Sequence, residues 1–314
     1  MSNFSVCVNA IVPIFLIMAA GYAAGRSGLI KKEETGAFNK IAFRVFLSLS
    51  VFSNIYGAKD GLSSVSTRLM GYCLVFIIAE FIVCTALTLV FEKKADRRGV
   101  VIQGIYRSNF VILGLPLAKN LLGADTDVSC VAALISVVIP VYNALAVVCL
   151  EVFSGKKVSA KKVIINILKN PLIISSLLAI AVVALKIKLP IAIERAVSDM
   201  AGVASPLMVF LLGASLDFSH IGEKSLTLLL VCISRLVAVP AAALFIGYSL
   251  GFRGAEFAAL IGVFATPTAV SSYTMVTQIG GDSSLAGNIV VFTSALCCFT
   301  VLAWSLIFKN LGAF

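Results

Sequence analysis

Long runs of apolar residues separated by short polar segments occupy almost the whole chain. A helix that crosses a bilayer needs roughly 20 mostly apolar residues. We therefore predict an all-α polytopic membrane protein with ten transmembrane helices. The ten runs cover residues 4–25, 36–56, 69–91, 100–122, 128–153, 164–185, 196–216, 225–250, 255–279 and 284–308. Within the sixth run, Asn170 and Pro171 offer an alternative helix start, because Asn caps helices and Pro suits the first helical position.

Composition agrees with this class. The chain is 60% hydrophobic and only 13% charged, with a mean hydropathy of +1.05, whereas soluble domains are about 25% charged. Its 314 residues leave little room for a soluble domain once ten helices are removed. The net charge of +10 would favour a nucleic-acid partner in a soluble protein. Here we expect no nucleic-acid partner, because the basic residues lie mainly in the loops between membrane helices, where they set the orientation of the protein.

The distribution of Lys and Arg predicts the orientation. The loops after the odd-numbered helices carry 14 basic residues and the opposite side carries 8. Cytoplasmic loops carry the excess, so we predict a multi-pass protein of the cytoplasmic (inner or plasma) membrane with both termini outside. The first run lacks a preceding basic region and a cleavage site, so we treat it as a mature helix rather than a signal peptide.

The chain divides into two halves of five helices. Residues 1–155 form the first half, residues 156–169 a basic cytoplasmic linker, and residues 170–314 the second half. An odd number of helices in each half makes the second repeat inverted. Pro116 lies in the fourth run of the first half and Pro267 in the fourth run of the second. Paired interruptions of this kind are typical of the binding site of a secondary transporter.

Each interruption should kink or break its helix. Proline removes one backbone donor and clashes with the carbonyl one turn earlier. In hydrocarbon, broken helices are tolerated only where the freed groups face protein or a water-filled cavity. We therefore expect a break at Gly114 and Pro116, a second at 265–272, and a polar site between them whose half-helix N-termini suit a carboxylate. A plain kink is the alternative for each proline.

The third helix of each half carries one ionisable residue near its middle, Glu80 in the first half and Arg235 in the second. A charge at that depth costs at least ~2.5 kcal/mol and marks a functional site by default. Two interpretations are open: Glu80 and Arg235 form a buried structural pair, or Glu80 carries a proton that is coupled to transport. Arg107 and Arg44 lie nearer the cytoplasmic helix ends, where long side chains snorkel. The alternative for Arg107 is that it attracts an anion into the inner vestibule.

Several ordered motifs resemble one family. The stretch from Asn109 through Gly114-Leu115-Pro116-Leu117 resembles the Asn-x-x-x-x-Gly-Leu-Pro-Leu fourth helix of the auxin efflux carrier family of bacterial transporters, relatives of the plant PIN proteins. Residues 206–216, 142–145 and 267–294 are similar to that family's seventh, fifth and ninth-to-tenth helices. One segment departs from the pattern: residues 47–52 read Leu-Ser-Leu-Ser-Val-Phe where relatives often carry a proline.

The resemblance implies a sodium/bile-acid-symporter-like fold. In that fold the fourth and ninth helices unwind and cross at their prolines, and a core moves against a scaffold of the first, second, sixth and seventh helices. Family substrates are organic anions such as auxin, malonate or malate. Together, the resemblance and the two breaks predict which residues contact the substrate or a coupling ion, H⁺ or Na⁺. These candidates are Asn109, Gly114, Pro116, Asn143, Thr266, Pro267, Thr268 and Ser271.

The sequence favours a secondary transporter of a small organic anion. Its partners are the anion and the lipid bilayer, and association into a homodimer is left open. It carries no G-x-x-x-x-G-K-[ST] motif for nucleotide binding. An intramembrane enzyme is disfavoured, because one histidine and dispersed acids do not form a catalytic cluster. The eight cysteines lack metal-site or disulfide spacing, so no cofactor or metal is expected. A channel or a sensory module that uses the same polar cavity remains the alternative.

Overall fold

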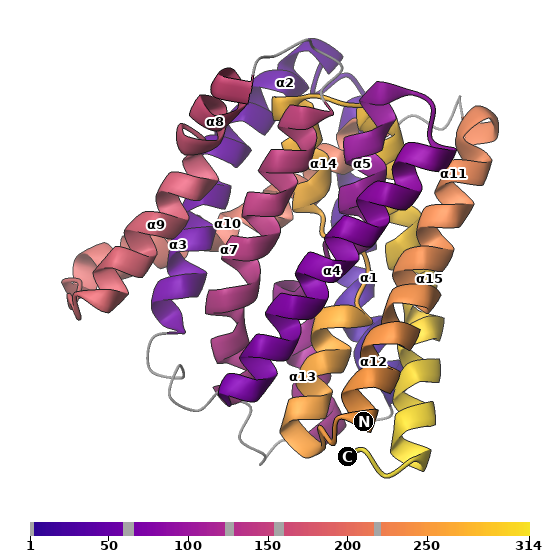
Figure 1. The fold of residues 1–314 in the computed structure, drawn as a ribbon. Helices are drawn as coiled ribbons and strands as arrows, with labels where there is room; N and C mark the ends of the chain where they lie inside the picture. The colour runs from indigo at the N-terminus through magenta and orange to yellow at the C-terminus, as the bar shows by residue number, and fades with distance from the viewer. Residues whose placement is uncertain (1–2, 59–65, 123–128, 154–159, 217–220) are drawn as a thin grey trace.

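The computed structural model describes residues 3–58, 66–122, 129–153, 160–216 and 221–314. Within these residues every regular element is a helix, which confirms the predicted all-α class. The helices form one bundle, and its first helix starts at the same end of the molecule as the C-terminus (Figure 1). The start of the predicted linker at 156–169 lies outside the described residues, and helix resumes there at Ala160.

Some apolar runs are single helices and others are built from consecutive pieces. In chain order, with η marking π-helical turns, the elements are α1 (Asn3–Arg26), α2 (Lys32–Ile41), η1 (Ala42–Leu47), α3 (Ser48–Gly57), α4 (Thr67–Phe91), α5 (Ala95–Tyr106), η3 (Phe110–Gly114), α6 (Leu115–Leu122), α7 (Ser129–Val152), α8 (Ala160–Leu168), α9 (Pro171–Ala184), α10 (Ile191–Ala214), α11 (Ile221–Ile233), η4 (Ser234–Ala238), α12 (Val239–Ser249), α13 (Gly254–Phe264), α14 (Ser271–Ile279) and α15 (Ser283–Asn310).

Among the described residues, five helices are long and apolar enough to cross a membrane by themselves. They are Thr67–Phe91, Ala133–Val152, Ile191–Ala214, Gly222–Ser249 and Ser283–Asn310. Shorter apolar helices cover Val12–Arg26, Phe110–Leu122, Pro171–Ala184 and Gly254–Phe264. Among the described residues, the apolar runs at 36–56, 100–122 and 255–279 are built from consecutive pieces rather than from one helix.

Proline lies beside two of the π-helical turns and at the start of one helix. Pro116 and Pro240 each come two residues after a π-helical turn, η3 and η4. Proline lacks the N–H for the usual bond to the carbonyl one turn earlier, and the wider π-turn accommodates the misfit. Asn170 caps α9 by accepting a bond from the Leu172 N–H, and Pro171 is the first helical residue. The alternative start of the sixth helix is therefore confirmed.

Helices α1, α2–η1–α3, α9 and α10 pack on one another, and the other helices pack mainly among themselves. Glycine brings α1 and α10 into backbone contact. A Cβ on Gly21 would lie 2.0 Å from Phe210 O, and one on Gly213 would lie 2.0 Å from Met18 O. No larger residue fits at either position, so this pair of helices is held at a fixed, close spacing.

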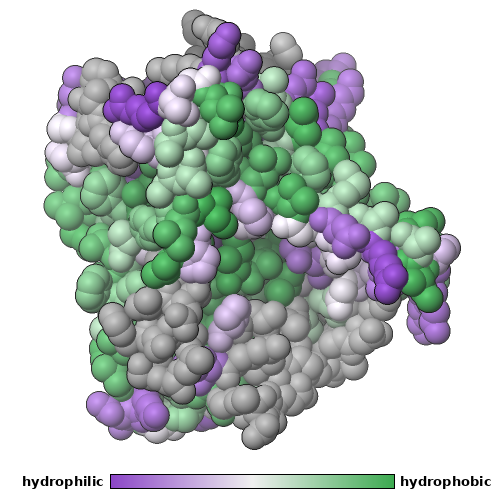
Figure 2. All heavy atoms as spheres, turned by 180° about the vertical axis from the view of Figure 1, so that it is seen from behind, coloured by the Kyte–Doolittle hydropathy of each residue, from purple (hydrophilic) through white to green (hydrophobic). Residues whose placement is uncertain are grey.

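The outer surface is that of a membrane protein. Apolar side chains cover most of the middle of the face in Figure 2, while hydrophilic ones gather mainly at its upper and lower edges and on a projecting arm. Many large apolar residues of α4 are exposed, including Val75, Ile82 and Val90. Lipid tails are the solvent that such a surface suits.

Candidate functional site

Two interrupted helices meet inside the bundle. α5 ends at Tyr106 and helix resumes at Phe110. α13 ends at Phe264 and helix resumes at Ser271. The predicted interruption of both segments is confirmed.

The backbone groups of each break find partners in the other. Ser108 and Thr268 pair as an isolated antiparallel bridge. The Asn109 N–H donates to the Pro267 carbonyl oxygen at 2.7 Å. Because the hydrocarbon core offers no water to replace lost helical bonds, this reciprocal pairing is what makes two breaks at the same depth tolerable.

The position of the first break differs from the prediction. It lies at 107–109, seven residues or more before Pro116, which is exposed on α6 beyond the η3 turn. The second break, at 265–270, lies where it was predicted. Gly114 has another role: a Cβ there would approach Gly262 O to 2.7 Å. Glycine is needed because the two interrupted segments cross at this point.

Arg235 closes the carboxyl ends of both broken helices. Its guanidinium is fully buried and donates to five backbone carbonyls, those of Ile105, Tyr106, Val263, Phe264 and Thr266. A helix C-terminus carries partial negative charge and unpaired carbonyls. Glu80 lies 3.7 Å from Arg235 Nη1, so the structure brings the two predicted partners together as a buried ion pair.

The threonines of the second break also serve the backbone. Thr266 Oγ1 donates to Gly262 O at 3.0 Å, and Thr268 Oγ1 donates to Gly104 O at 2.6 Å. Both side chains are buried. Their hydroxyls thus donate to carbonyl oxygens near the helix ends, which is one way in which a broken helix in a membrane is stabilised.

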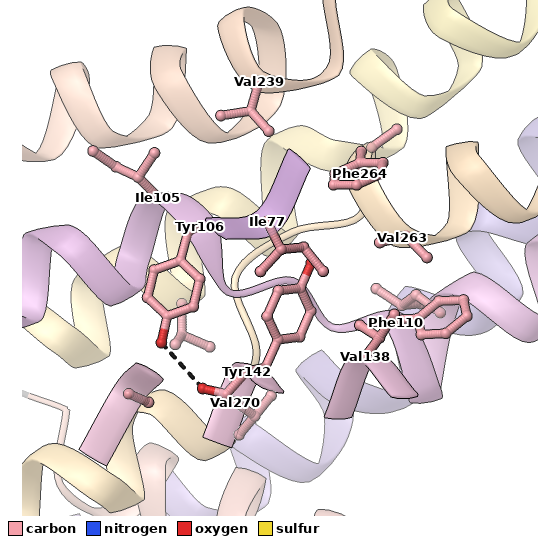
Figure 3. Close-up of a cluster of buried hydrophobic side chains, with 14 of the residues drawn as sticks. Ile77, Ile105, Tyr106, Phe110, Val138, Tyr142, Val239, Val263, Phe264 and Val270 are labelled. Atoms are coloured by element: carbon pink, nitrogen blue, oxygen red, sulfur yellow. Dashed lines mark hydrogen bonds between the residues drawn. The ribbon is translucent and has the colours of Figure 1, made fainter. Parts of the chain in front are cut away.

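An apolar and aromatic cluster surrounds the carboxyl side of the breaks. Figure 3 shows Tyr106 and Tyr142 in this cluster, with the Tyr106 hydroxyl bonded to the Tyr142 carbonyl oxygen at 3.1 Å. Their ring centroids are 5.8 Å apart. Phe110 and Phe264 are fully buried in the same cluster. Phe110 and Tyr142 also belong to the lining of the cavity described next, so the cluster borders that cavity.

A cavity of about 370 Å³ lies beside the amino ends of the resumed helices. Arg107, Asn109 and Asn143 line it, and all three are at least 95% buried. Arg107 Nη2 donates to Asn143 Oδ1 at 2.6 Å, and Nη1 contacts the Met275 sulfur. The amide nitrogens of Asn109 and Asn143 have no hydrogen-bond partner. The buried polar pole of the cavity therefore presents a positive charge and unused donors.

The opposite wall comes from α3 and α10. It adds uncharged polar side chains at helical spacing, namely Ser50, Ser53 and Asn54 on α3 and Ser198 and Ser205 on α10. Apolar side chains complete the lining, among them Leu47, Val51, Ile112, Ile139 and Met208. The cavity thus has one charged pole, a neutral polar wall and an apolar remainder.

The helix ends add to the positive pole. Residues 110–112 at the start of η3 and Ser271 at the start of α14 line the cavity. The first N–H groups of a helix lack partners within it and carry partial positive charge. Such ends are ready-made sites for a carboxylate or phosphate. Charge, free donors and helix ends therefore all favour an anion.

The structure brings only part of the predicted site to the cavity. Asn109, Asn143 and Ser271 line it. Of the other predicted contacts, those that do not belong to the described lining are Gly114, Pro116, Thr266, Pro267 and Thr268. Gly114, Thr266, Pro267 and Thr268 shape the meeting point of the breaks instead, whereas Pro116 lies on α6 away from it.

Sequence reasoning missed the wall from α3 and α10. On α10 the spacing of Ser198, Gly202 and Ser205 places small and polar residues on one face of a helix, and all three line the cavity. On α3, Ser50 and Asn54 repeat the pattern at a spacing of four. A stripe of this kind inside a predicted membrane helix is the signal that was available.

Comparison with known proteins identifies the lineage. A family described as "Membrane transport protein" matches residues 6–305. The chain belongs to this family of membrane transport proteins. This confirms the resemblance to the auxin efflux carriers noted in the sequence.

Relatives align over nearly their full length. This transporter family member is 25% identical to the uncharacterized transporter YfdV of Escherichia coli (strain K12) over 298 residues, covering 91% of the chain and 94% of the relative. It is 21% identical to an uncharacterized transporter of Methanothermobacter thermautotrophicus over 311 residues, covering 95% and 97%. The cavity beside the two breaks therefore belongs to a membrane transport protein.

Proposed function

We propose that this protein is a secondary active transporter of a small organic anion, a carboxylate or dicarboxylate of the auxin, malonate or malate kind. The anion binds in the cavity beside the breaks. The observation that carries the proposal is the Arg107 guanidinium: it is buried, lines the cavity, and has no carboxylate partner among the described residues. A buried cation without a counter-ion is costly, and a bound carboxylate would offset that cost.

Shape supports a small solute. A volume of about 370 Å³ falls within the range of small-molecule pockets. A carboxylate would accept hydrogen bonds from Arg107, Asn109 and Asn143, and its carbon skeleton would lie against Ile112, Ile139 and the neighbouring apolar lining. Asn109 and Asn143 have free amide donors for this purpose.

The wider architecture of the proposal is two inverted five-segment halves, residues 1–155 and 170–314, joined by the linker at 156–169. Two observations support it. The interrupted segments occupy corresponding positions in the halves, and the paired Glu80 and Arg235 come from the segment before each. Alternating access around the meeting point of the breaks, coupled to H⁺ or Na⁺ or driven by the anion's own gradient, then follows from the general behaviour of inverted-repeat carriers.

The experiment is uptake into proteoliposomes. Labelled malonate, malate and indole-3-acetate are supplied with imposed proton or sodium gradients to wild type, Arg107→Gln, Asn109→Ala and the control Arg44→Gln, whose side chain is exposed. We expect saturable flux that both cavity variants lose and the control keeps. Normal flux in Arg107→Gln and Asn109→Ala would remove the site. Unsaturable conductance without counterflow would favour a channel.

A further inference from the structure

A second polar cavity, of about 750 Å³, lies at the end of the bundle opposite the two termini. The end of α1, the start of α2, the end of α10, the second half of α14 and the start of α15 enclose it. Its hydroxyl-bearing lining residues are Tyr22, Thr35, Ser215, Tyr273, Thr277, Ser283 and Ser284. Arg26 is the charged side chain in its described lining. Nothing in the packing of the helices requires so polar a space.

We propose that this second cavity is a further anion-binding station on the route of the transported solute, reached from the first cavity past the α14 helix. The inference rests on the proposed function. It assigns to the second cavity the same ligand chemistry, a carboxylate, and a position at the other face of the membrane.

Two helices, α14 and α10, carry lining residues of both cavities. On α14, Ser271 lines the first cavity and Tyr273 the second. On α10 the two linings are separated only by the residues between Met208 and Ala214. Between the cavities α14 packs against η1 and α10. Both cavities therefore border α10 and α14, and the contacts of α14 with η1 and α10 form the layer that the proposed route would cross.

That layer is apolar and tightly closed. Phe43 of η1, Leu212 of α10 and Tyr273 of α14 are all at least 95% buried. The Tyr273 ring lies 3.7 Å from the Cβ position of Gly287. The proposed route therefore requires α14 to shift relative to η1 and α10, the elements that carry these buried side chains.

The electrostatics of the second cavity favour an anion. Ser283 and Ser284 are the first residues of the 28-residue helix α15, so its positive end faces the cavity. The cap of that helix, Asp282, pairs with Arg97 at 3.1 Å and with Lys224 at 2.9 Å. These three side chains are outside the described lining of the cavity, and they hold the start of α15 in place beside it.

The cap is held ionised. Burial by itself raises the pKa of Asp282. Hydrogen bonds from the Leu285 N–H and from Lys224, together with the charges of Lys224 and Arg97, lower the pKa by more than burial raises it, so it lies below its usual value. An ionised, doubly paired Asp282 does not repel an anion at the helix end as a lone carboxylate would.

A buried polar atom of the cavity lacks a partner. Asn39 lines the cavity and is 2% exposed. Its Nδ2 donates to Thr35 O, while its Oδ1 has no hydrogen-bond partner. A buried acceptor left unpaired costs about 1–3 kcal/mol. A ligand hydroxyl, a protonated carboxyl or a hydrating water carried with the anion would satisfy it.

The first test blocks the cavity. Gly36 lines it, and a side chain there would meet nothing within 4 Å, so Gly36→Trp fills the space without a backbone clash. Gly71→Trp on α4 is the matched control, since Gly71 has the same open surroundings and lines neither cavity. We expect Gly36→Trp to abolish flux of labelled malonate or indole-3-acetate and to remove one of the two binding sites in detergent, while the affinity of the remaining site stays within twofold of wild type. The control should keep both.

The second test removes the cation. Arg26→Gln should raise the KM for anion supplied from the face of the second cavity about tenfold, the effect of losing one charge-assisted bond, and leave the KM from the other face unchanged. Lys40→Gln, beside Asn39 but exposed, should alter neither. Undiminished flux through Gly36→Trp, or an Arg26→Gln variant with both KM values unchanged, would overturn the second station. Absence of any binding by wild type would instead overturn the proposed function, and this inference with it.

Discussion

Replacing Arg235 with lysine tests how the two broken helices are held together. Arg235 is fully buried and donates to five backbone carbonyls at the ends of α5 and α13. Lysine keeps the positive charge and the pairing with Glu80, so the ionic part of the interaction changes little. What is lost is the planar, multi-donor geometry of the guanidinium.

The magnitude follows from the donors. An ammonium has three N–H groups, so Arg235→Lys leaves at least two of the five carbonyls unpaired. Each buried, unsatisfied carbonyl costs about 1–3 kcal/mol, which gives a loss of about 2–6 kcal/mol. Arg235→Met should be worse, because it also leaves Glu80 buried without its partner, at about 3–5 kcal/mol.

The assay uses the protein's own thiols. Cys73, Cys84, Cys149, Cys232 and Cys297 are buried, so a thiol-reactive dye reports unfolding in detergent as temperature rises. Arg235→Lys should melt well below wild type. Glu80→Gln is the informative companion: it removes the charge partner of Arg235 but leaves five carbonyl oxygens bonded around the buried guanidinium, so its melting temperature should fall less.

One outcome would refute this reasoning. If Arg235→Lys melted with wild type while Glu80→Gln melted far lower, the ion pair and not the carbonyl bonds would hold the breaks together. The order of the two melting temperatures therefore decides between the two explanations without reference to transport.

Three further predictions concern other contacts. Gly21→Ala should lower the melting temperature because its Cβ would lie 2.0 Å from Phe210 O, at a cost of about 1–3 kcal/mol, whereas Gly71→Ala, which meets nothing within 4 Å, should not. Asp282→Asn should be less stable than wild type at pH 7; because the folded pKa of Asp282 lies below its usual 3.8, its contribution is present above pH 3.8 and is lost on further acidification, so melting curves of the two proteins should converge there, and a constant gap would contradict the ion cluster. Thr268→Val should destabilise by about 1–3 kcal/mol, since it leaves a glycine carbonyl of α5 unpaired; unchanged melting would show that this hydroxyl is dispensable.

That proline would disturb the helical hydrogen bonding of both segments was predictable, because its effect is local. Proline acts through its own ring and its missing N–H, whatever the surroundings, and apolar runs report a lipid environment directly. Where the first segment unwinds is not local. The helix ends at Tyr106 rather than at Pro116 because Ser108 and Asn109 find partners at Thr268 and Pro267, residues distant in the chain.

The sequence by itself determined the class of the protein, its family and the presence of Asn109 and Asn143 at the site. The tertiary structure decided which neighbours they have. Arg107 was assigned by sequence to a helix end or to the attraction of an anion, and it lines the cavity, where its side chain donates to Asn143. Hydropathy is a property of each residue, whereas a cavity exists only between helices, so its walls could be known only once α3 and α10 were packed against the breaks.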